Sequence, residues 1–123
     1  MTRWGAVCAV VAIAVFVTES AHARCVAPFS FSVTSAGPWQ SFGTIKSGET
    51  CSGSFNSSGP MSFRRLYLAV APQHGSVRLQ EGGKYFYTAK QGYAGADSFT
   101  LKVCGNQGGL DGCTDIQYNM TLK

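Results

Sequence analysis

Downstream of residue 23, glycine and proline interrupt this sequence too often for a long amphipathic helix to form. The chain has 123 residues with 15 glycines and 4 prolines, and no long window keeps an apolar period of 3.6 residues. Between these breaks lie short runs, and residues 29–33 alternate apolar and polar side chains with a period of two. We therefore predict an all-β domain. The predicted strands are residues 29–34, 42–46, 50–55, 65–71, 76–80, 84–88, 98–104 and 114–122.

About seven or eight short strands in one domain are typical of a β-sandwich. Such a fold must bury an apolar face on each sheet, and aromatic residues make up 12% of this chain. The residues predicted to form the core are Phe29, Phe31, Phe55, Tyr67, Tyr87, Phe99 and Tyr118.

The N-terminus has the pattern of a secretory signal peptide. Arg3 precedes an apolar run at residues 4–17, and Ala21 and Ala23 form the A-x-A pattern of a cleavage site. The run is shorter than the roughly 20 residues that span a bilayer. We predict a signal peptide at residues 1–23, cleaved after Ala23, and a single domain at residues 24–123 without stable membrane insertion. An uncleaved N-terminal anchor is the alternative.

Four cysteines remain once the predicted leader has removed Cys8. An even number in an exported chain predicts two disulfides. Strand alternation separates the possible pairings, because Cys104 and Cys113 share the polar, outward parity of their segments. Cys25 and Cys51 share the apolar, inward parity. We therefore predict the pairs Cys25–Cys51 and Cys104–Cys113.

The chain is mildly basic, with a formal net charge of +4. Its cations are scattered, apart from the adjacent Arg64 and Arg65, which does not resemble a nucleic-acid-binding stripe. His74 is the one histidine left after the predicted cleavage, and no cysteine pair has the spacing of a zinc knuckle. We expect no metal, no cofactor and no nucleic-acid partner.

Two motifs in the second half of the chain resemble those of bacterial Ig-like, cadherin-like modules. Residues 72–77 read P-Q-H-G-S-V, which resembles the P-x-H-G-x-V turn and strand of these modules. After Tyr87, residues 92–99 read G-Y-A-G-A-D-S-F, which resembles their G-[FY]-x-G-x-D-S-F motif. The resemblance covers about residues 45–122 and implies an Ig-like antiparallel β-sandwich. Members of the family usually serve as spacers or cell-surface binding modules.

The sequence departs from the family pattern at three positions. Ala89 replaces the proline that follows the tyrosine, Leu101 replaces a second aromatic residue, and Gly105 stands where these modules often carry an acidic residue. The departure at Gly105 disfavours calcium at that end of the domain.

The motif residues have structural interpretations. Gly75, Gly92 and Gly95 permit a positive φ, and Asp97 can accept backbone N–H bonds at a turn. Contact of Asp97 with a ligand or ion is the alternative. The predicted structural turn motif consists of Pro72, His74, Gly75, Gly92, Gly95, Asp97 and Phe99.

No set of reactive residues emerges from the sequence. A hydrolytic triad needs a base and an orienting acid, whereas His74 lies in a turn motif and the predicted disulfides consume the thiols. The glycine-rich residues 105–109 open no helix, so we predict a hairpin loop there and no phosphate-binding loop. We therefore predict that the protein is not an enzyme.

Two features form a possible binding surface. The first is Trp39, which is either an exposed contact residue or a side chain that fills part of the core. The second is the loop at residues 105–112, which carries Leu110 near its tip and a predicted disulfide at its base. The leading hypothesis is a monomeric, secreted or periplasmic, non-catalytic Ig-like protein that binds an unknown protein or polysaccharide of the envelope or extracellular space. The alternatives are a structural cell-envelope component without a discrete ligand, and a small secreted enzyme inhibitor that uses the 105–112 loop.

Overall fold

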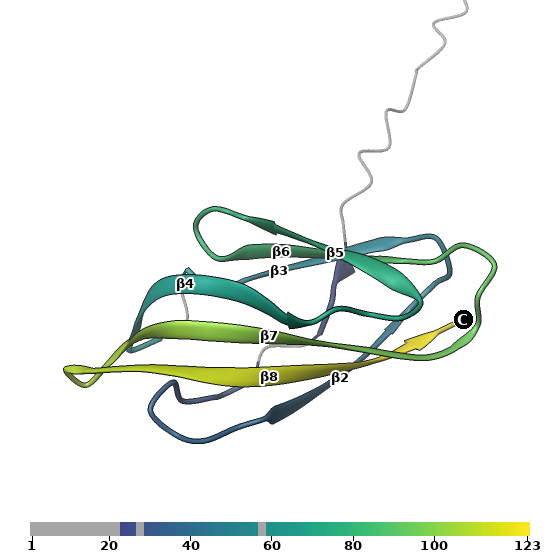
Figure 1. Ribbon diagram of the computed structural model, residues 1–123. Coiled ribbons are helices and arrows are strands. Elements are labelled where there is room, and N and C mark those ends of the chain that lie inside the picture. The colour runs from purple at the N-terminus through teal and green to yellow at the C-terminus, as the bar shows by residue number, and fades with distance from the viewer. Residues whose placement is uncertain (1–22, 27–28, 57–58) are drawn as a thin grey trace, which may run out of the picture.

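The chain forms two four-stranded sheets packed face to face (Figure 1). The computed structural model describes residues 23–26, 29–56 and 59–123, and no helix occurs among them. Sheet A has the strand order β1-β3-β6-β5, and sheet B has the order β2-β8-β7-β4. The predicted all-β, Ig-like sandwich is therefore confirmed. The strands are β1 (Ala23–Arg24), β2 (Trp39–Ile45), β3 (Thr50–Ser54), β4 (Met61–Val70), β5 (Gly75–Gln80), β6 (Lys84–Ala89), β7 (Gly95–Gln107) and β8 (Leu110–Leu122).

The predicted signal peptide lies outside the described residues except for Ala23. Ala23 and Arg24 form β1, which pairs in parallel with Cys51 and Ser52 of β3. Two residues carry no periodic pattern, so the sequence predicted no strand here. The adjacent Cys25 donates its backbone N–H to the carbonyl of Ser52 at 3.1 Å, which extends the contact between this segment and β3.

The hairpin of β7 and β8 is the longest strand pair, with 13 residues in each strand. Gly108 and Gly109 connect the strands with φ angles of 61° and 83°, the left-handed backbone that a two-residue hairpin turn requires. The predicted hairpin at residues 105–109 therefore forms, but its turn is shorter than the 105–112 loop expected from the sequence. Two glycines suffice for the turn, so the residues on either side remain paired as far as Gln107 and Leu110.

The predicted strand at residues 29–34 does not form. This segment leads from β1 in sheet A to β2 in sheet B, so it pairs with neither sheet along its length. Its alternation still places side chains toward the interior: Val33 is buried, and Phe29 and Phe31 are partly buried against the core. An alternation of apolar and polar side chains shows that one side of an extended segment is buried. It does not require that the segment is hydrogen-bonded to a neighbouring strand. Each of the other seven predicted strands overlaps an observed strand.

Stacked aromatic rings fill the space between the sheets. The ring of Phe99 lies 5.0 Å from that of Tyr87 and 4.7 Å from that of Tyr118, measured between centroids. All three are fully buried, and Phe55 is buried beside them, as predicted. Tyr67 is 44% exposed, so its predicted place in the core is wrong. It pairs in register with Lys102 on the outward face of sheet B.

Both predicted disulfides are confirmed. Cys25 and Cys51 are buried, with their Cα atoms 4.7 Å apart. Cys104 and Cys113 face each other in register across β7 and β8, with their Cα atoms 4.1 Å apart. The first disulfide ties the N-terminal segment to sheet A, and the second closes the base of the β7–β8 turn.

Candidate functional site

Asp97 lies at the start of β7, where its buried carboxylate accepts three hydrogen bonds. Oδ1 accepts the backbone N–H groups of Gln73 at 3.1 Å and Ser98 at 2.9 Å. Oδ2 accepts the hydroxyl of Tyr87 at 2.5 Å. Burial, and secondly this hydrogen bond to Asp97, raise the pKa of Tyr87 well above its usual value. Because β6 carries Tyr87 and β7 carries Asp97, the pair links sheet A to sheet B.

The other residues of the predicted turn motif surround this link. The ring of His74 stacks on Tyr93, with centroids 3.7 Å apart, and the His74 carbonyl accepts the backbone N–H of Lys90 at 2.9 Å. Pro72 is partly buried in the connection from β4 to β5, and Phe99 lies in the core. These contacts hold the turn together and leave no paired acid and base aimed at a substrate.

The three motif glycines serve two different purposes. Gly92 and Gly95 have φ angles of 83° and 139°, as predicted. Gly75 is absent from the positive-φ positions, so that part of the prediction is wrong. A Cβ at Gly75 would lie 2.5 Å from the carbonyl oxygen of Thr88 and 2.8 Å from the ring of Tyr87. Glycine is needed there because the strand passes close to its neighbour.

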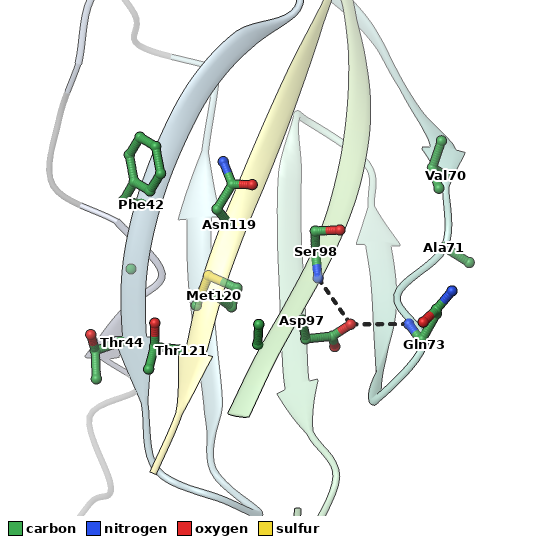
Figure 2. A pocket seen from close by; sticks show the side chains of 12 residues that line it. Phe42, Thr44, Val70, Ala71, Gln73, Asp97, Ser98, Asn119, Met120 and Thr121 are labelled. Atoms are coloured by element: carbon green, nitrogen blue, oxygen red, sulfur yellow. Dashed lines mark hydrogen bonds between the residues drawn. The ribbon is translucent and has the colours of Figure 1, made fainter. Parts of the chain in front are cut away.

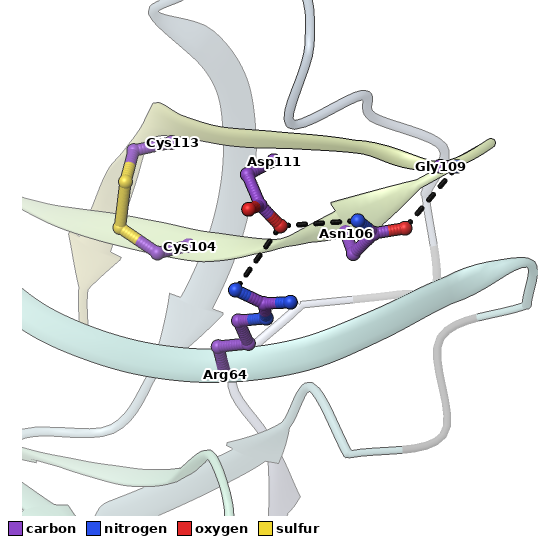
Figure 3. A network of polar contacts seen from close by, with 6 residues as sticks. All are labelled: Arg64, Cys104, Asn106, Gly109, Asp111 and Cys113. Carbon is purple, nitrogen blue, oxygen red and sulfur yellow. Dashed lines mark hydrogen bonds and ion pairs between the residues drawn. A yellow bond between two sulfur atoms is a disulfide. The ribbon is translucent and has the colours of Figure 1, made fainter.

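The end of the β7–β8 hairpin forms a braced arm beyond the Cys104–Cys113 disulfide (Figure 3). Arg64 Nη1 lies 3.1 Å from Asp111 Oδ1, and the side-chain amide of Asn106 donates to the same oxygen at 3.0 Å. The Asn106 Oδ1 accepts the backbone N–H of Gly109 at 3.2 Å. The exposed ion pair contributes little by itself, about 0–1 kcal/mol. The disulfide and the strand pairing therefore fix the arm, which presents Leu110 at 64% exposure.

Trp39 occupies a different environment from Leu110. Its ring is partly buried against the core, and its Nε1–H donates to the Thr114 hydroxyl at 3.0 Å. That hydroxyl donates in turn to the carbonyl of Ser35 at 3.0 Å. The structure thus places Trp39 at the start of β2 with its polar group satisfied internally, and it does not bring Trp39 and Leu110 together into one surface.

A hollow on the outward face of sheet B escaped the sequence interpretation (Figure 2). It has a volume of about 780 Å³, within the range of small-ligand sites. Phe42 of β2, Asn119 of β8 and Ser98 of β7 lie in register across it, and Val70 of β4 stands at the far side. The Phe42 side chain is 74% exposed. Strand parity could have identified the exposed Phe42 side chain. Ile45, three residues further along β2, is buried, so Phe42 must point to the opposite, outward face.

Aromatic residues line a second hollow, of about 790 Å³, beside the N-terminal segment. Phe29, Phe31, Tyr85 and Tyr118 are among the residues that line it. Burial raises the pKa of both tyrosines above the usual value, and the neighbouring hydroxyl of Tyr85 adds to the upward shift at Tyr118. Both hydroxyls therefore stay neutral at physiological pH and supply no base.

Neither a metal cluster nor a membrane-spanning helix was found in the part of the chain that the structure describes. No three His, Cys, Asp or Glu side chains come together there in a way that could hold a metal ion. The same residues include no helix with the length and hydropathy that crossing a bilayer requires.

The comparison with known families decides the classification. A family model described as bacterial Ig domain matches residues 40–116, a span that runs from β2 into β8 and covers more than half of the chain. The chain belongs to the bacterial Ig domain family. The resemblance to bacterial Ig-like modules is thereby confirmed. A search of the curated proteins gave no match.

The bacterial Ig domain is a non-enzymatic fold family, so membership supports a non-catalytic module. The two disulfides agree with this classification, because disulfides persist in oxidising compartments. Family and disulfides together are consistent with an extracellular or periplasmic location.

Proposed function

We propose that this bacterial Ig domain is an exported, monomeric and non-catalytic module that binds a partner of the cell envelope or extracellular space through sheet B. One observation carries the proposal. Among the described residues, five large apolar side chains are exposed, and every one belongs to a strand of sheet B. They are Phe42, Tyr67, Leu68, Val70 and Leu110.

On sheet A, by contrast, an arginine side chain covers the outward aromatic residue. Phe86 pairs in register with Arg78, whose guanidinium carbon lies 4.4 Å above the centre of the ring. Phe42, Tyr67 and Val70 share the outward face of sheet B, whereas Leu68 and Leu110 have the parity of the buried residues of their strands. Uncovered apolar side chains that gather on one face mark interaction sites more often than isolated ones do. This asymmetry favours sheet B as the binding face.

A non-catalytic role accounts for the residues that could otherwise react. His74 stacks on Tyr93, the four described cysteines form disulfides, and three donors occupy the carboxylate of Asp97. Export follows from the predicted signal peptide at residues 1–23 and from the need for an oxidising compartment.

Binding to isolated envelope fragments of the producing cell tests the proposal. The oxidised wild-type protein should bind saturably, and replacing exposed residues of sheet B should weaken the binding. A structural envelope component without a discrete ligand would co-fractionate with the wall but show no saturation. Binding that persists after both Phe42→Ser and Leu110→Ser, each in a folded protein, would refute the assignment to sheet B.

Leu110 supports a second candidate, a small secreted enzyme inhibitor. The residue is 64% exposed next to the turn of an arm that a disulfide closes, and a preorganised arm loses little entropy on insertion into a cleft. Leu110→Asp should then leave folding intact and abolish inhibition of the target enzyme. Inhibition that survives this change would exclude the arm as the wedge.

A further inference from the structure

The hollow on sheet B combines an exposed aromatic ring with a row of uncharged polar side chains. Phe42 and Ser98 stand on either side of Asn119 (Figure 2), in register on three neighbouring strands. With about 4.8 Å between strands, the row from β2 to β7 extends about 10 Å. Thr44 and Thr121 lie one row further along the same strands. The floor is thus a flat sheet face, with Phe42 at one edge.

The charge of the hollow favours an uncharged ligand. Among the described residues that line it, Asp97 is the one ionisable side chain, and it is 7% exposed with both oxygens accepting hydrogen bonds. A phosphate or carboxylate would therefore meet no cation in the lining, although the whole chain carries a net charge of +4. A cation would meet no free carboxylate there.

Three amide side chains beside the hollow form a closed ring of hydrogen bonds. Gln40 donates to Gln117 at 3.2 Å, Gln117 donates to Asn119 at 3.4 Å, and Asn119 donates back to Gln40 at 2.9 Å. A further bond, at 3.1 Å, runs from the Asn119 amide to the carbonyl of Ser41. These contacts hold the amides in place before any ligand arrives, which lowers the entropy cost of binding.

The ring of amides still has hydrogen-bonding capacity to spare. Each amide nitrogen carries two N–H groups and each amide oxygen two lone pairs, so Gln40 and Gln117 each retain one N–H donor. The oxygens retain acceptor capacity, and the hydroxyl of Ser98 can donate or accept. Donors and acceptors alternate on this surface without charge, which complements the hydroxyl groups of a sugar.

The exposed ring of Phe42 supplies an apolar surface beside the polar amides. The ring faces of a pyranose present C–H groups, and these can bury apolar area against a flat aromatic ring. An acyl chain would bury the spare donors and acceptors of the amides and the nearby hydroxyls without pairing them, at a cost in desolvation. A sugar satisfies both parts of the surface.

We propose that the hollow on sheet B binds an uncharged glycan, with a sugar ring stacked on Phe42 and sugar hydroxyls bonded to Asn119, Ser98 and the amide ring. This inference rests on the proposed function, and it names the chemical class of the partner. It requires recognition by ring face and hydroxyls, and no charge on the glycan.

Calorimetric titration of the full, oxidised chain tests the inference. The probes are three uncharged hexasaccharides, namely cellohexaose, maltohexaose and chitohexaose, with hexagalacturonate as the charged comparison. At least one uncharged probe should bind, and Phe42→Ala should weaken that binding at least about tenfold. Phe42→Tyr, which keeps the ring, should bind within about threefold of the wild type. Gln80→Ala is the control, because Gln80 is exposed on β5 of sheet A and does not line the hollow.

Several results would overturn the inference. They are no binding of any uncharged probe at millimolar concentration, binding that Phe42→Ala leaves within twofold, or tighter binding of hexagalacturonate. If envelope fragments still bind the wild type but not Leu110→Asp, while no glycan binds, the inference fails and the proposed function stands. If neither glycans nor envelope fragments bind, both fail.

Discussion

The hydroxyl of Tyr87 donates to Asp97 at 2.5 Å across the interface between the two sheets. Tyr87 is fully buried and Asp97 is 7% exposed, so the bond lies largely out of contact with water. The same carboxylate holds the backbone of Gln73, in the connection before β5. The residues that gave the family resemblance thus tie the sheets together at one end of the domain.

Removing the Tyr87 hydroxyl should destabilise the domain. Tyr87→Phe leaves the Asp97 carboxylate buried with one donor fewer, and a hydrogen bond to a charged group contributes about 1.5–3 kcal/mol. Urea unfolding should show that loss in the free energy of unfolding. Tyr67→Phe is the control, because Tyr67 is exposed, and it should change stability by less than about 0.5 kcal/mol. Equal stability of the Tyr87→Phe variant and the wild type would contradict this account of the link.

The stability of the domain should fall in alkaline solution. The raised pKa of Tyr87 means that the folded chain keeps this proton at pH values where the unfolded chain, with a tyrosine pKa of about 10, has lost it. The contribution is therefore complete below about pH 10 and decreases above it, by about 1.4 kcal/mol per pH unit for each such tyrosine. Unfolding curves between pH 8 and 12 measure the slope, which Tyr87→Phe should reduce. A flat profile above pH 10 would contradict the prediction.

The two disulfides should differ in their contribution to stability. They close loops with sequence separations of 26 and 9 residues, which the chain-entropy model values at roughly 3.5 and 2.7 kcal/mol. Replacing Cys25 and Cys51 by alanine should therefore cost more than replacing Cys104 and Cys113. The second variant should also raise hydrogen exchange at Asn106 and Asp111 while leaving β5 and β6 protected. A larger loss from the second pair would reverse the order expected here.

Gly75 should not tolerate a side chain. Its Cβ would meet the carbonyl of Thr88 at 2.5 Å, a backbone contact that cannot move without shifting β6, so Gly75→Ala should cost about 1–3 kcal/mol. Gly108→Ala is the comparison, because Gly108 has a φ of 61° and open space around it. That variant should lose only about 1 kcal/mol, from backbone strain. Thermal unfolding ranks the two, and a smaller loss at Gly75 would argue against the close approach.

Strand alternation predicted most of the sandwich, and it predicted the Cys104–Cys113 disulfide because β7 and β8 pair without interruption from end to end. A regular pair keeps every second side chain on one face, so the parity of Cys104 and Cys113 could be counted from their neighbours. The same counting failed at residues 29–34, where the side chains alternate but the backbone passes between the sheets. Tyr67 was assigned to the core because it is aromatic, without a parity argument. Leu66, on the opposite parity, packs against the core instead, and β4 contains two register shifts.

The hollow on sheet B could not be assembled from the sequence. Parity places Phe42 on the outward face, and it likewise places Asn119 on the polar face of its strand. Phe42 and Asn119 are neighbours because β2 pairs in parallel with β8. These two strands lie near opposite ends of the domain's sequence. Local periodicity carries no information about such a pairing, since neighbouring strands of a sandwich need not be consecutive in the chain.

Hydroxyl-radical footprinting of the oxidised protein, free and bound to envelope fragments of the producing cell, tests most directly whether sheet B is the binding face. The account predicts that labelling of Phe42 and Val70 falls on binding, while labelling of Val77 and Leu79 on β5 stays unchanged. Protection of β5 with undiminished labelling of Phe42 would contradict it.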